Sequence, residues 1–305
     1  MKRILTLYLL TFLMAQSLFA QKLPTTNVYL FDTSTQEDAS FKLTNPIYLT
    51  AFNNEGYNNQ PYFMNNEELY LTVQLSEDTT QTDIYSLNFK TGVKTQVTAT
   101  SESEYSPTYQ YNMFNNIKSP PQFTCIRVEN DANASQRLWR FPLSRKNNGK
   151  AIFAGQNKIG YHAWINDYEA VLFIVDTPHR LIVANNRSGN TQNIGTNIGR
   201  CLQRNSGDEI HYVFKLSPDV WFIRAIDPVT RKTRSIVETV PGSEDFVLMP
   251  DGSILMAKDS KVYHWNPTIS NDWIEIADLQ NYSIGNITRL ALRAGKLALV
   301  NKSPF

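Results

Sequence analysis

The sequence predicts an all-β protein, a six-bladed β-propeller with four-stranded blades. Short segments rich in β-branched and aromatic residues alternate with turn residues along most of the chain. Four such segments form a unit that recurs down the sequence. No stretch has the spacing of apolar residues typical of a long amphipathic helix, which excludes a parallel α/β architecture. We therefore expect a ring of similar antiparallel sheets.

The clearest copy of the unit lies between Tyr57 and Thr98. Its first strand is expected over residues 57–63 and ends at an Asn65-Asn66 turn. Three further strands are expected over residues 68–73, 83–89 and 93–98, with a Lys90-Thr91-Gly92 turn before the last.

Five further units follow, beginning at Glu104, Gly160, Gly199, Ser243 and Asn286. Equivalent points in the six first strands are Pro61, Pro107, His162, Arg200, Asp245 and Arg289, with spacings of 46, 55, 38, 45 and 44 residues. A period of about 40–50 residues with four strands per repeat is typical of a β-propeller.

The last unit supplies only two strands, near residues 286–291 and 297–300. Two strands at the other end of the chain, over residues 27–31 and 41–44, have no unit of their own. We expect these pairs to share one sheet, so that blade six consists of residues 27–44 and 286–300 and the ring closes. The predicted organisation is a signal peptide over residues 1–20 and one propeller over residues 21–305.

The predicted signal peptide has a basic start at Met1-Lys2-Arg3 and an apolar run over residues 4–15. Ala20 offers a small residue at a cleavage point, and the apolar run is shorter than the roughly 20 residues of a membrane-spanning helix. We therefore expect a periplasmic or secreted protein. Without Lys2 and Arg3, the formal charge changes from +1 to −1, and no basic stripe predicts nucleic-acid or membrane binding.

The two cysteines, Cys125 and Cys201, fall in non-adjacent units, so we expect two free thiols. The four histidines lack the short spacing of zinc ligands, and neither a metal nor another cofactor is expected. The five tryptophans are expected to fill gaps between blades rather than to stack on sugars. We expect a monomer.

The first strand of each blade lines the channel of a propeller, so its polar residues are the candidate site. We expect an anion-binding group at the channel mouth, consisting of Gln60, Glu104, His162, Arg200, Glu244, Asp245 and Arg289. In this interpretation the arginines grip a carboxylate or phosphate, and the acidic residues orient them. In the alternative interpretation the same groups only tie neighbouring blades together by ion pairs. Two positions beyond the six equivalent points, each first strand has an apolar residue that should pack between blades. These residues form an apolar column of Phe63, Tyr109, Trp164, Leu202, Val247 and Ala291.

Three functions follow from these candidates. The first is a non-catalytic binding propeller that holds, at the channel mouth, a small anion or a peptide of a partner such as an envelope protein. The second is a propeller hydrolase or lyase in which His162 is the general base and Arg200 and Arg289 stabilise an anion. The third is a scaffold that docks proteins through its loop rim, above all through residues 113–122. No Gly-x-Ser-x-Gly motif is present, which argues against a fused serine hydrolase.

Several short motifs resemble the repeat of the TolB-type, WD40-like (PD40) six-bladed propellers. They are Gln60-Pro61-Tyr62-Phe63, Asp83-Ile84-Tyr85, Thr91-Gly92, Val97-Thr98 and the turn Pro250-Asp251-Gly252. The resemblance implies a bacterial envelope or secreted protein that uses its ring for binding. TolB also has an α/β domain ahead of its propeller, for which we expect no counterpart in this sequence.

Overall fold

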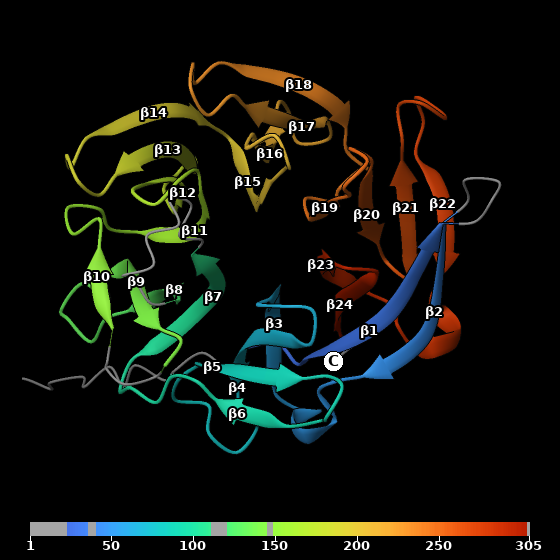
Figure 1. Cartoon of the computed structure of the whole chain (residues 1–305), viewed down its shortest axis with the longest axis horizontal. Coiled ribbons are helices and arrows are strands. Elements are labelled where there is room, and N and C mark those ends of the chain that lie inside the picture. Colours follow the sequence, from blue (N-terminus) through green and yellow to red (C-terminus); the bar gives the residue numbers. More distant parts are fainter. Residues whose placement is uncertain (1–22, 36–40, 111–120, 145–148, 304–305) are drawn as a thin grey trace, which may run out of the picture.

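The computed structural model describes residues 23–35, 41–110, 121–144 and 149–303. The predicted signal peptide therefore lies outside the described residues, as do residues 113–120 of the predicted loop rim. The described strands form six four-stranded antiparallel sheets arranged as a ring, as the sequence predicts (Figure 1).

Each of the first three blades is one continuous stretch of chain, with its first strand innermost (Figure 1). Blade one consists of β3 (Tyr57–Phe63), β4 (Glu68–Gln74), β5 (Asp83–Asn88) and β6 (Lys94–Gln96). Blade two consists of β7 (Ser103–Gln110), β8 (Gln122–Val128), β9 (Gln136–Pro142) and β10 (Lys150–Ile152). Blade three consists of β11 (Ile159–Trp164), β12 (Glu169–Ile174), β13 (Arg180–Asn185) and β14 (Thr191–Thr196).

Blades four and five repeat this order. Blade four consists of β15 (Ile198–Arg204), β16 (Ile210–Lys215), β17 (Trp221–Ile226) and β18 (Thr233–Glu238). Blade five consists of β19 (Phe246–Leu248), β20 (Ile254–Lys258), β21 (Lys261–Trp265) and β22 (Ile274–Asp278). Two short 3-10 helices, η1 (Ala51–Asn53) and η2 (Gln280–Tyr282), lie in connections between blades.

Blade six joins the two ends of the chain, which confirms the predicted closure. Its sheet order is β2 (Phe41–Tyr48), β1 (Thr26–Thr35), β24 (Lys296–Lys302) and β23 (Ile287–Arg293). Val28 lies opposite Val300 in the antiparallel ladder between β1 and β24. Both side chains are fully buried, so the closing pair of strands contributes to the core as well as to the ring.

The hydrophobic core is divided among the interfaces between blades. Among the described residues, six apolar clusters occur, one for each pair of neighbouring blades. Phe63, Trp164 and Val247 belong to these clusters, which confirms the predicted packing of the apolar column between blades. The middle strands read as nearly continuous apolar runs because both of their faces are covered, and in β12 five of six residues are buried.

The inner strand of blade five is shorter than the sequence predicts. β19 covers only Phe246–Leu248, so Glu244 and Asp245 lie in the connection ahead of it. A turn at Pro241-Gly242 precedes this connection, with Gly242 at φ 78° and a hydrogen bond from the Ser243 amide to the Val240 carbonyl. Asp245 links this connection to blade six, because its carboxylate accepts a 2.7 Å hydrogen bond from the backbone amide of Leu290.

Candidate functional site

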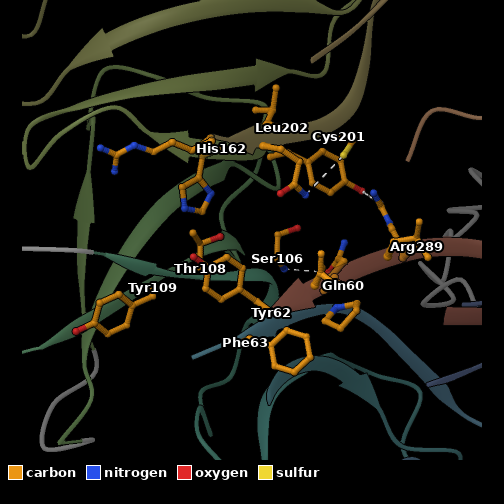
Figure 2. Close-up of a pocket in the computed structure, with 18 of the residues that line it drawn as sticks. Gln60, Tyr62, Phe63, Ser106, Thr108, Tyr109, His162, Cys201, Leu202 and Arg289 are labelled. Carbon is orange, nitrogen blue, oxygen red and sulfur yellow. Dashed lines mark hydrogen bonds between the residues drawn. The ribbon is translucent and has the colours of Figure 1, made fainter. Parts of the chain in front are cut away.

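The centre of the ring contains a pocket of about 760 Å³ (Figure 2). Five inner strands line it, namely β3, β7, β11, β15 and β23, and blade five contributes Asp245. In each of these strands the lining residues begin near the equivalent point of the repeat and continue toward the C-terminal end of the strand. The first lining residue of each blade is Gln60, Ser106, Tyr161, Arg200, Asp245 or Arg289. Arg200, Asp245 and Arg289 are equivalent points of the repeat, and Gln60, Ser106 and Tyr161 each stand one residue before such a point. We call these six residues the pocket floor.

A β-bulge occurs at the floor level in all five of these inner strands. The register shifts between Asn59 and Tyr62 in β3 and between Tyr105 and Thr108 in β7, with equivalent shifts in β11, β15 and β23. Gln60 and Ser106 adopt left-handed φ angles of 54° and 55° there. A bulge re-aims side chains and breaks the strict alternation of a strand. The prolines that follow are tolerated because inner strands are sheet edges.

The bulge in β3 gives Gln60 a structural contact between blades. Its Oε1 accepts hydrogen bonds from the Thr72 hydroxyl at 2.6 Å and from the Ser106 backbone amide at 2.9 Å. The side chain thus joins blade one to blade two at the edge of the pocket floor.

Arg289 joins three blades at the floor. Its Nη1 lies 3.1 Å from the Asp245 carboxylate, and its Nη2 donates a 2.6 Å hydrogen bond to the hydroxyl of Tyr161. Burial acts to lower the pKa of Arg289, but the neighbouring Tyr161 and Asp245 raise it, so the guanidinium stays charged. Burial raises the pKa of Asp245 above its usual range, although Arg289 and Arg200 oppose that rise. Arg289 is therefore already held by protein groups.

Arg200 lies on the same floor with a looser set of contacts. Its Nε is 3.3 Å from the Glu244 carboxylate, its Nη2 is 3.4 Å from the Thr288 carbonyl, and its side chain is 37% exposed. Glu244 is shared with Lys215, whose Nζ lies 2.8 Å away. Burial would raise the pKa of Glu244, but the Lys215 hydrogen bond and the charges of Arg200 and Lys215 together lower it. One carboxylate thus faces two cations, and a positive charge remains.

Gly199 makes this arrangement possible. A Cβ on Gly199 would lie 2.9 Å from a Glu244 carboxylate oxygen and 3.0 Å from the Val213 Cβ. The absence of a side chain lets Glu244 approach β15 and reach Arg200.

His162 lines the pocket wall from blade three, apart from the two arginines. Its Nε2 is 2.7 Å from the Thr124 hydroxyl of blade two, which also accepts a bond from the Trp164 indole. The Nδ1 is buried and makes no hydrogen bond with the described residues. Burial lowers the pKa of His162 to about 3, so the imidazole is neutral at physiological pH. A base this weak is poorly matched to proton abstraction near neutral pH.

Glu104 is not among the residues that line the pocket. It is fully buried in blade two, where it accepts a 2.9 Å bond from the Nε of Arg127 and a 2.6 Å bond from the Thr100 hydroxyl. Burial raises the pKa of Glu104 to about 7, although Thr100 and Arg127 act in the opposite direction. The structure thus brings Gln60, His162, Arg200, Asp245 and Arg289 to one pocket, with Glu244 behind Arg200 and Glu104 elsewhere.

Several pocket residues were not expected from the sequence. Arg204 and Arg293 line the outer part of the pocket, Arg204 paired with Asp208 and Arg293 bonded to Asn66. They stand four residues beyond Arg200 and Arg289, so the same Arg-x-x-x-Arg pattern recurs in two equivalent strands. That internal repeat is the signal that could have identified them.

The observed pairing bears on the choice between an enzyme and a binding protein. A catalytic site of the kind considered above needs an arginine without a carboxylate partner near His162. In the structure Arg289 is paired with Asp245 and Arg200 with Glu244, and His162 contacts Thr124. Both arginines considered for that site therefore have carboxylate partners.

The described part of the chain also bears on metal binding, membrane insertion and thiol chemistry. In that part of the chain no group of three His, Cys, Asp or Glu side chains could hold a metal ion. No helix there is long and apolar enough to cross a membrane. Cys125 and Cys201 are free, as predicted; both are also buried, and burial raises the pKa of both thiols. The five tryptophans pack in or against the clusters between blades, as predicted.

Comparison with solved structures identifies the fold as that of the TolB propellers. The chain superposes on a putative TolB from Agrobacterium tumefaciens with a TM-score of 0.64, 8% identity, and coverage of 93% of this chain and 100% of the other. TolB from Acinetobacter baumannii gives a TM-score of 0.55 at 10% identity over 92% of this chain and 64% of the other.

A puromycin-hydrolyzing peptidase from Mycobacterium tuberculosis gives a TM-score of 0.55 at 10% identity, over 90% of this chain but only 48% of the peptidase. The chain thus spans less than two thirds of the Acinetobacter protein and about half of the peptidase. No protein-family model and no curated protein sequence matches the chain. At these identities the likeness establishes a TolB-like six-bladed propeller and nothing about a ligand.

Proposed function

We propose that this protein is an exported, non-catalytic binding propeller that holds an anionic ligand in its channel pocket. The observation that carries the proposal is the position of Arg200 on the pocket floor, half-exposed and only partly neutralised by Glu244. The formal charge of the whole pocket lining is also positive, because the lining contains four arginines and two aspartates. Complementary charge both attracts and orients an anion.

Export rests on the N-terminal pattern of Met1-Lys2-Arg3, the apolar run and Ala20. It fits a binding role in the periplasm or outside the cell, where the ligand is either a small anion or a segment of an envelope protein. Mass spectrometry of the protein recovered from the cell envelope tests export, because cleavage after Ala20 leaves Gln21 as the first residue. An intact N-terminus on that protein would contradict the proposal.

Binding is tested by isothermal titration calorimetry with citrate, phosphate and a glutamate-rich hexapeptide, at low and high salt. We expect at least one anion to bind, with an affinity that falls as salt rises. Arg200→Gln should weaken that binding about tenfold or more.

The matched control is Arg180→Gln. Arg180 is similarly exposed and also paired with one carboxylate, that of Asp176, but it does not line the pocket. The proposal fails if no carboxylate or phosphate compound binds, or if Arg200→Gln and Arg180→Gln bind alike.

A further inference from the structure

The two sides of the pocket differ in chemistry. Aromatic side chains come from blades one to three, and arginines come from blades four and six. The aromatic residues are Tyr62, Phe63, Tyr109, Tyr161 and Trp164, and the arginines are Arg200, Arg204, Arg289 and Arg293. In Figure 2 Tyr109 and Arg289 lie on opposite sides of the pocket, with Tyr62 and Phe63 between them. A ligand that fills the pocket therefore meets an apolar wall and a cationic wall together.

The size of the pocket excludes a bare inorganic ion as a complementary ligand. Its volume of about 760 Å³ lies within the range of sites for drug-sized molecules. An ion the size of a few water molecules, at roughly 30 Å³ each, would leave most of this space unfilled. The anionic group is therefore part of a larger molecule.

The cationic wall offers one site for a singly charged head group. Arg289 is 9% exposed, and both of its Nη atoms are held, by Asp245 and by Tyr161. Arg204 is paired with Asp208, and Arg293 bonds to Asn66. Among the described residues Arg200 has only two contacts, both long, with the Glu244 carboxylate and the Thr288 carbonyl. Because Glu244 is shared with Lys215, part of the positive charge is left over. Its planar fork suits a carboxylate, while Asp245 nearby disfavours a dianion such as phosphate.

The aromatic wall suits a flat apolar body. Tyr62 and Tyr109 line the pocket and are partly exposed, although both also pack against the cluster between blades one and two. Trp164 and Phe63 also line the pocket but are buried in other clusters between blades. Such rigid side chains bind another ring by offset or edge-to-face contacts.

Building on the proposed function, we propose that the ligand is an aromatic carboxylate. Its carboxylate binds Arg200, and its ring lies against Tyr62 and Tyr109. The same chemistry is presented by a free aromatic acid and by the terminal carboxylate of a peptide that ends in an aromatic residue.

The test is calorimetric titration of the purified protein with four probes, which are N-acetylphenylalanine, its carboxamide, acetate and acetyl-Gly-Gly-Phe. We expect N-acetylphenylalanine to bind about tenfold or more tightly than its carboxamide, and acetate to give no measurable binding. Arg200→Gln should remove the preference for the acid over the carboxamide, and Arg180→Gln should keep it. Tyr109→Leu should weaken binding of the acid, with circular dichroism as the check on folding.

The two proposals fail separately. If citrate or phosphate binds as tightly as N-acetylphenylalanine and Tyr109→Leu has no effect, the aromatic carboxylate is overturned while anion binding stands. Equal affinity for acid and carboxamide also overturns it. If no anion of either panel binds, both proposals fall. Tighter binding of acetyl-Gly-Gly-Phe supports a peptide terminus as the source, and equal or weaker binding supports a free acid.

Discussion

The hydroxyl of Tyr161 accepts a 2.6 Å hydrogen bond from the guanidinium of Arg289 across the middle of the ring. Tyr161 belongs to blade three and Arg289 to blade six, which face each other in a six-bladed ring. The guanidinium also lies over the tyrosine ring, 4.9 Å from its centroid. This contact ties opposite blades together at the pocket floor, whereas the apolar clusters join only neighbouring blades.

Tyr161→Phe should therefore destabilise the protein by about 1.5–3 kcal/mol, because a buried charged donor loses its acceptor. The measurement is the free energy of unfolding in urea. Tyr85→Phe is the control, since the Tyr85 ring stacks on Phe52 and its hydroxyl makes no hydrogen bond with the described residues. Equal stability of the two variants would show that the bond across the ring contributes nothing.

Closure of the ring is testable by a disulfide between its two terminal strands. Val28 and Val300 are direct partners in an antiparallel ladder, where Cα atoms are about 4.5–5.5 Å apart, within the range of a disulfide. We expect Val28→Cys with Val300→Cys to oxidise to an intrachain bond, seen as a faster band on a non-reducing gel.

The control pair for this experiment is Val28→Cys with Val175→Cys, because Val175 follows β12 in the opposite blade. The native thiols of Cys125 and Cys201 are buried and contribute no background bond of their own between these blades. Absence of the bond in the first pair, or its presence in the second, would contradict the closure.

Glu104 should make the protein less stable as the pH rises. Burial raises its folded-state pKa to about 7, from 4.5 in an unfolded chain. Between these values the folded state holds a proton that the unfolded state releases, so the free energy of unfolding falls as pH increases. Glu104→Gln removes the carboxyl group and with it this pH dependence of the free energy of unfolding. We expect its stability relative to the unsubstituted protein to rise from about pH 5 to about pH 8. A constant difference across that range would sink this assignment.

His162 should act in the opposite direction. Burial lowers its folded-state pKa to about 3, from 6.5 in an unfolded chain. The unfolded state therefore binds a proton first as the pH falls, and the stability present above about pH 6.5 is lost progressively toward pH 3. His162→Gln should flatten this acid limb in urea titrations at each pH. His179→Gln is the comparison, because His179 does not line the pocket. An unchanged acid limb in His162→Gln would contradict the buried, neutral imidazole.

The sequence predicts the fold well because a propeller is specified by local signals that repeat. Turn residues such as Pro250-Asp251-Gly252 and runs such as Ala170–Ile174 mark each strand independently of distant contacts. The strand β14 (Thr191–Thr196) was not anticipated, because Ile194 is its one large apolar side chain and the segment therefore lacks the apolar alternation of a strand.

The chain's own repeat thus determined the ring, its closure through Val28 and Val300, and the level at which Arg200, Asp245 and Arg289 meet. Only the tertiary structure decided their partners. Tyr161 and Arg289 are 128 residues apart, and bulges at the floor turn side chains away from the alternation that a sequence pattern assumes. Local chemistry fixes which strands form, whereas the partner of each charge depends on where distant strands place it.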